Sequence, residues 1–95
     1  MPKTYHILLV ENNNADIKLI QGELNKLDIV IRLEVISNIK EMIQQLENDL
    51  PDLIISGYDL PKATGMEALT MVRAKQPRLP FILISKFISP PSILF

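Results

Sequence analysis

Cysteine and tryptophan are absent from this chain of 95 residues, and aromatic residues make up only 5% of it. The lack of cysteine excludes disulfide bonds and thiolate metal sites. An excess of either charge is also lacking, because ten Lys and Arg residues stand against eleven Asp and Glu residues and the formal net charge is -1. This balance gives no electrostatic basis for binding nucleic acid or an anionic membrane surface.

Long apolar runs are missing as well. The longest run near the N-terminus covers residues 7–10, which is too short for the apolar region of a signal peptide or for a membrane-spanning helix. We therefore expect a cytoplasmic protein with no membrane partner. A chain of this length forms one domain at most, and it buries ~60–70% of the surface that its unfolded form exposes.

The apolar residues that are present recur in patterns that predict strands alternating with helices. Continuous apolar runs are typical of parallel strands covered on both faces, and they occupy residues 7–10, 53–55 and 81–84. Residues 31–35 alternate between apolar and polar, which is typical of a strand at a sheet edge. Apolar stripes at helical spacing follow three of these strands, at Ile17, Ile20, Leu24 and Leu27, at Ile39, Met42, Ile43 and Leu46, and at Leu69 and Val72.

Strands joined through helices by short connections imply a parallel sheet with right-handed crossovers. The predicted fold class is therefore α/β, with four strands and three helices in one domain over residues 1–85. Residues 86–95 break the pattern, because Pro90 and Pro91 disfavour the start of a helix. We expect an irregular apolar tail that finds cover on its own domain or on a partner.

Polar side chains at the ends of the predicted strands indicate where helices begin. Asn13 or Asn14 can cap the first helix, and Ser37 or Asn38 can cap the second. The stretch from Thr64 to Glu67 fits a capping box for the third helix. It follows a loop that opens after the strand at 53–55, and in parallel α/β sheets ligand sites lie at the carboxyl ends of strands.

Four stretches together resemble the receiver domain of bacterial response regulators: Ile-Leu-Leu-Val-Glu-Asn-Asn, Pro-Asp-Leu-Ile-Ile-Ser-Gly-Tyr-Asp-Leu-Pro, Thr-Gly-Met-Glu-Ala-Leu and Leu-Pro-Phe-Ile-Leu-Ile-Ser. The resemblance covers residues 6–85. It implies a flavodoxin-like doubly wound sheet, incomplete here because the fifth strand, with its phosphate-contacting lysine, and the last helix are missing. It also implies two-component phosphorelay signalling, in which a histidine kinase phosphorylates an aspartate of the receiver.

The same resemblance assigns the site residues. The acidic pair that helps to bind Mg²⁺ falls on Glu11 and Asn12, the metal-binding backbone carbonyl falls on Asp59, and the phosphate-sensing hydroxyl falls on Ser85. The phosphoacceptor position falls on Gly57, which has no carboxylate to form an acyl phosphate. Mg²⁺ is expected to bind weakly or not at all, because two of the three expected carboxylates are replaced.

These residues lead us to expect a module that binds other proteins without phosphorylation and is not an enzyme. Its partner would be a histidine kinase or a downstream regulator, and the exposed edge of the fourth strand favours a homodimer. Two alternatives remain: a Mg²⁺-dependent phosphoacceptor that uses Asp59, and an inactive truncated fragment. A nucleotide-binding enzyme is disfavoured, because no glycine-rich phosphate loop follows the first strand.

Overall fold

A computed structural model describes residues 3–85 and 92–94 of the chain. Its main sheet has the strand order β2-β1-β3-β6-β7. The four parallel strands are β1 (Thr4–Val10), β2 (Val30–Ile36), β3 (Leu53–Gly57) and β6 (Phe81–Ser85). The helices are α1 (Asn14–Asn25), α2 (Ile39–Asn48) and α3 (Gly65–Lys75). This arrangement confirms the predicted flavodoxin-like α/β fold with four parallel strands and three helices.

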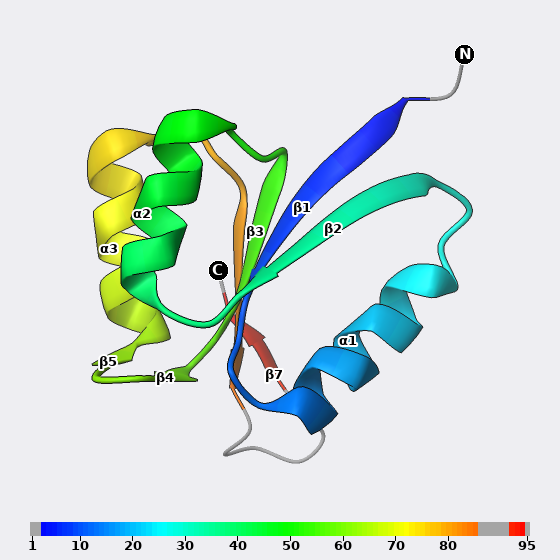
Figure 1. Ribbon diagram of the computed structural model, residues 1–95, viewed down its shortest axis with the longest axis horizontal. Helices are drawn as coiled ribbons and strands as arrows, with labels where there is room; N and C mark the ends of the chain where they lie inside the picture. The colour runs from blue at the N-terminus through cyan, green and yellow to red at the C-terminus, as the bar shows by residue number, and fades with distance from the viewer. Residues whose placement is uncertain (1–2, 86–91, 95) are drawn as a thin grey trace.

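Helices cover both faces of the sheet, with α1 on one face and α2 and α3 on the other (Figure 1). The central strand β1 pairs with β2 on one side and β3 on the other and is covered by helices on both faces, and its residues Leu8, Leu9 and Val10 are 0% exposed. The outer strand β2 alternates between exposed and half-buried residues, as predicted for an edge strand.

Two apolar clusters form the core, one on each face of the sheet. The larger cluster lies under α2 and α3 and includes Met42, which is completely buried. The smaller cluster lies under α1 and is built on Ile7, Leu9 and Ile55. The difference follows from the number of helices, because one helix covers less of a sheet face than two do.

Side-chain caps begin each helix and fix the loops at the carboxyl edge of the sheet. Asn13 caps α1 and Asn38 caps α2, each by accepting a backbone N–H bond from the first turn. Thr64 and Glu67 form the predicted capping box of α3, with the Thr64 N–H donating to Glu67 Oε2 at 2.8 Å. Each cap satisfies a backbone donor that has no partner within its helix.

Sequence reasoning missed two features of the sheet region. A small antiparallel ribbon of β4 (Asp59–Leu60) and β5 (Ala63–Thr64) stands between β3 and α3, and its turn holds Lys62 at a φ of 59°. The second feature is β7 (Ser92–Leu94), which pairs antiparallel with β6 at residues 83–85. Part of the tail predicted as irregular is therefore a strand, because backbone groups at the open edge of β6 find partners there.

None of the helices in the described part of the chain is long and apolar enough to span a membrane.

Candidate functional site

The candidate site lies where β1 and β3 end. Val10 is paired with Ser56 across the two strands, so the next residues, Glu11 and Gly57, face each other at the carboxyl edge of the sheet. A Cβ atom placed on Gly57 would lie 3.0 Å from Glu11 Cδ and closer still to Glu11 Oε1. The carboxylate of Glu11 therefore fills the space that a side chain at position 57 would need.

Backbone groups hold the Glu11 carboxylate in this place. Glu11 Oε2 accepts hydrogen bonds from the N–H groups of Asn12 at 2.9 Å and Asn13 at 3.1 Å, and the residue is only 4% exposed. Its own N–H donates to the carbonyl of Ile36 at 2.9 Å, which ties the loop to β2. A carboxylate beside the first turn of α1 is also favoured by the dipole of that helix. The Glu11 side chain is thus part of the folded loop rather than a free ligand.

The second acidic residue of the site, Asp59, is exposed at the start of β4. Its position is fixed through its neighbour Tyr58, whose N–H donates to the carbonyl of Ile84 at 3.0 Å and whose carbonyl accepts from the N–H of Gly65 at 2.6 Å. Glu11 and Asp59 line one cleft of about 550 Å³ together with Tyr58 and apolar residues of α1, β3 and β6. The structure therefore brings these two sequence-predicted residues together.

The other two predicted site residues lie outside the described lining of this cleft. Asn12 is exposed, and its contribution to the site is the N–H group that binds Glu11. Ser85 is 7% exposed at the end of β6, where it pairs with Ser92 of β7. All four residues lie near the carboxyl edge of the sheet, and of these Glu11 and Asp59 line one cleft.

These residues do not fit a magnesium centre. Mg²⁺ prefers octahedral oxygen ligands and usually takes one or two carboxylates. The buried carboxylate of Glu11 is turned onto the backbone of its own loop, and Asn12 offers an amide instead of a second acid. Among the described residues of this site, no three carboxylate or imidazole side chains lie close enough together to hold a metal ion.

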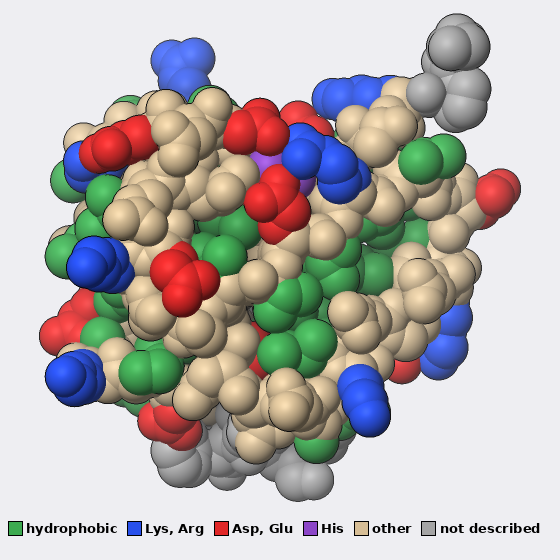
Figure 2. Space-filling model, viewed as in Figure 1, with side chains coloured by type: hydrophobic (Ala, Val, Ile, Leu, Met, Phe, Trp, Pro, Cys, Tyr) green, Lys and Arg blue, Asp and Glu red, His purple; other side chains and the backbone are tan. Residues whose placement is uncertain are grey.

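A cluster of ionisable side chains lies at the opposite end of β1. The buried ring of His6 places Nε2 2.8 Å from Glu34 Oε1 and Nδ1 3.8 Å from Asp49 Oδ2. The guanidinium of Arg32 donates to both of these carboxylates at 2.8 Å. Figure 2 shows side chains of both charges gathered around the histidine. Within the described residues, this is the group of His, Asp and Glu side chains close enough to hold a metal ion.

Arg32 occupies the carboxylates of this cluster and shapes its electrostatics. The hydrogen bond from Arg32 lowers the pKa of Asp49, and the same bond raises the pKa of Arg32. With its carboxylates already paired to a cation, the cluster joins β1, β2 and the end of α2 as a polar network. Sequence reasoning could not find this cluster, because its members are far apart in the chain.

The strand order, the helices on both faces and the cleft at the carboxyl edge define a doubly wound α/β domain with its candidate site where the parallel strands end. Residues 7–94 match the family model of the response regulator receiver domain, and the chain belongs to this family. It is a receiver domain of two-component signalling.

Solved structures support this assignment. The phosphorylated cyanobacterial phytochrome response regulator RcpA is 29% identical, has a TM-score of 0.78, and is matched over 92% of this chain and 69% of its own. The receiver domain of the sensor histidine kinase PA1611 from Pseudomonas aeruginosa, with magnesium in its active-site cleft, is 26% identical with a TM-score of 0.72 over 85% of this chain and 66% of its own.

A curated relative matches a shorter stretch. The regulatory protein LuxO of Vibrio vulnificus is 33% identical over 55 residues, which is 58% of this chain and 12% of LuxO. The chain thus spans only a small part of this relative.

Proposed function

We propose that this receiver domain acts as a protein-interaction module that works without phosphorylation, with Gly57 at the position where the family carries its phosphoacceptor aspartate. The contact between Glu11 and Gly57 carries the proposal. The space for a side chain at position 57 is filled by a buried carboxylate that accepts two backbone hydrogen bonds. The loop is built around a residue that has no side chain.

The chemistry of phosphotransfer supports the same conclusion. A phosphoryl group is accepted by a carboxylate oxygen that attacks phosphorus in line with the leaving group. Gly57 offers no nucleophile, and Glu11 is 4% exposed. In addition, no three carboxylates among the described residues of the cleft lie close enough together to hold Mg²⁺, which would neutralise the phosphate. We therefore propose that the domain binds Mg²⁺ weakly or not at all and is not an enzyme.

Asp59 supports the second candidate, a residual Mg²⁺-dependent phosphoacceptor. It is exposed and lines the same cleft as Glu11. However, it belongs to the β4–β5 ribbon and lies two residues beyond the end of β3. Displacement from the strand end changes the direction of attack, and phosphoryl transfer depends strongly on alignment. We favour the interaction module for this reason.

Partners are proposed from the family alone: a histidine kinase or a downstream regulator, with cytoplasmic localisation. The sequence favoured a homodimer through an exposed edge of β6, and the structure gives this proposal less support. Residues 83–85 of β6 already pair with β7, so a second chain would have to displace that strand or pair elsewhere.

Intact-mass measurement after incubation with acetyl phosphate and Mg²⁺ tests this function. We expect no phosphoryl adduct on the natural chain, while the RcpA receiver treated in parallel gains one. An adduct that disappears in Asp59→Asn would establish the second candidate. An adduct that persists in Asp59→Asn and disappears in Glu11→Gln would place the chemistry on Glu11 and also overturn the proposal.

A further inference from the structure

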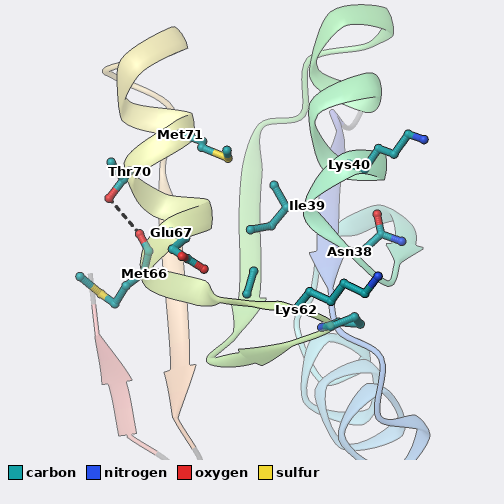
Figure 3. Close-up of a pocket in the computed structure, with 10 residues that line it drawn as sticks. Asn38, Ile39, Lys40, Lys62, Met66, Glu67, Thr70 and Met71 are labelled. Atoms are coloured by element: carbon teal, nitrogen blue, oxygen red, sulfur yellow. Dashed lines mark hydrogen bonds between the residues drawn. The ribbon is translucent and has the colours of Figure 1, made fainter.

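A second groove lies on the face of the domain that α2 and α3 cover. Its volume is about 850 Å³, and it is lined by the beginning of α2, the turn of the β4–β5 ribbon and the outer side of α3. It shares no lining residue with the cleft that contains Glu11 and Asp59. Figure 3 shows the residues that form it.

The centre of this groove is apolar. Met66 and Met71 of α3 are 47% and 43% exposed, and the half-buried Ile39 of α2 lies across the groove from Met71. Ile39 and Met71 point toward each other from α2 and α3 (Figure 3). Flexible methionine side chains adapt to the shape of a bound apolar surface, and they are frequent at protein-binding grooves.

The charge that the groove offers to a ligand is basic. Lys40 and Lys62 are exposed, and neither forms an ion pair within the described part of the chain. The lining also contains one acidic residue, Glu67, whose carboxylate accepts the Thr64 N–H in the capping box, so the two lysines exceed the acidic charge of the groove by one. An acidic ligand would thus find two available cations beside the apolar centre.

The backbone at Lys62 points to the same use. Its φ of 59° lies in the left-handed region, which glycine or asparagine adopts more easily than lysine. Stability alone would favour glycine at this turn. A residue whose side chain disfavours its own backbone conformation is expected mainly at functional sites. Here that residue is Lys62, and its side chain brings an ammonium group to the groove.

We propose that this groove binds an amphipathic α-helix of a partner protein, with apolar side chains against Ile39, Met66 and Met71 and with Asp or Glu residues against Lys40 and Lys62. An amphipathic helix in an apolar groove is an established mode of recognition. The proposal deepens the interaction function proposed above by naming the surface and the chemistry of its partner. It does not depend on whether position 57 is phosphorylated.

A second copy of the chain fits the groove less well than a partner does. The most suitable acidic helix of the chain is α1, with Asp16 and Glu23. Its apolar stripe, which includes Ile17, Ile20 and Leu24, already packs on its own sheet. Of the larger apolar side chains of α1, Leu19 remains exposed, at 66%. One leucine does not provide the stripe that the groove would bind.

Methyl NMR on the intact chain tests the proposal. The probe is a synthetic helical peptide of ~18 residues with leucines on one face and glutamates beside them, and its matched control carries lysine in place of every glutamate. We expect the glutamate peptide to shift the methyl signals of Ile39, Met66 and Met71. The lysine peptide should bind about tenfold more weakly or worse, and the affinity of the glutamate peptide should fall as salt is raised.

Three variants assign the effect to the groove. Lys40→Glu with Lys62→Glu should weaken binding of the glutamate peptide about tenfold or more, while Lys18→Glu with Lys26→Glu, a charge-matched pair on α1 and at its C-cap, should leave the affinity unchanged. Lys62→Gly should weaken binding about 2–5-fold and should unfold at a temperature no lower than that of the natural chain. A loss of binding in Lys62→Gly then cannot be attributed to unfolding.

Equal affinity for the two peptides, an unchanged affinity in the Lys40 and Lys62 variants, or no methyl shift at millimolar peptide would overturn the proposal. Groove signals that change with protein concentration in the absence of peptide would identify a second copy as the occupant, which would also overturn it. None of these outcomes bears on the acetyl phosphate experiment, so failure of the groove and failure of the proposed function are distinguishable.

Discussion

Glu11 and Gly57 are complementary neighbours: the carboxylate of the first occupies the volume that the absent side chain of the second leaves open. The two residues stand side by side because β1 and β3 are paired in parallel up to the preceding position. Buried carboxylates are stable only when their oxygens are hydrogen-bonded, and the N–H groups of Asn12 and Asn13 provide these bonds. The pairing is therefore a single unit, in which a change at either residue acts on the other.

Gly57→Ala should destabilise the domain by about 1–3 kcal/mol, because the new methyl group forces Glu11 away from its two backbone donors. Urea unfolding followed by circular dichroism measures the effect. The double variant Glu11→Ala with Gly57→Ala should be more stable than the sum of the single changes implies, because the methyl group then has room. If the double variant lost as much stability as the two single variants lose together, Glu11 and Gly57 would not be in contact.

The other two glycines provide a contrast. A Cβ on Gly65 would meet Leu83 Cδ1 and the carbonyl of Gly57, whereas a Cβ on Gly22 has nothing within 4 Å. We expect Gly65→Ala to destabilise the fold by at least ~2 kcal/mol, since backbone atoms cannot move aside as a flexible side chain can. Gly22→Ala in the exposed middle of α1 should stabilise it by about 0.5–1 kcal/mol. Thermal unfolding of both variants checks these signs, and a loss of stability in Gly22→Ala would be inconsistent with an open site.

The pair of Arg32 and Asp49 should make stability depend on pH at acidic values. Arg32 lowers the pKa of Asp49 below its usual value of 3.8, so folding favours the charged carboxylate. The stabilisation is present above pH 3.8 and is lost as the pH falls through the lowered pKa of the folded state. At neutral pH the natural chain should have a larger free energy of unfolding than Asp49→Asn, and this difference should disappear as the pH falls below 3.8 and through the lowered pKa. A small effect is expected because both side chains are exposed, and a constant difference across the range would count against the pair.

Pairing of β7 with β6 should control self-association. Ile93→Pro removes a backbone N–H from β7, and proline is poorly tolerated within a strand ladder. The edge of β6 would then be open to another chain. We expect sedimentation to show association that rises with concentration in Ile93→Pro but not in the conservative control Ile93→Val. Identical behaviour of the two variants would show that β7 does not protect this edge.

Much of the fold follows from local patterns in the sequence. The buried strands at residues 7–10 and 53–55 are recognisable because parallel strands covered on both faces lack polar residues, and the Thr64–Glu67 capping box was identified because its spacing is local. The carboxyl-edge location of Glu11 and Asp59 follows from the same patterns. These features need no knowledge of distant contacts.

Features that depend on contacts between distant residues could not be predicted in this way. The orientation of the Glu11 side chain depends on an empty volume across the sheet at Gly57. The network around His6 joins residues from β1, β2 and the end of α2, and each residue alone has the appearance of an ordinary surface charge. The turn at Lys62 was also missed, because lysine gives no local signal for a positive φ.

The antiparallel direction of β7 determines how short its connection to β6 can be. To add a parallel neighbour, a sheet needs a crossover connection of about a dozen or more residues, which usually supplies another helix. Running antiparallel, β7 reaches the side of β6 through residues 86–91 alone. Six residues between the two strands, instead of a dozen or more, are therefore enough to pair the outer edge of β6 with a further strand.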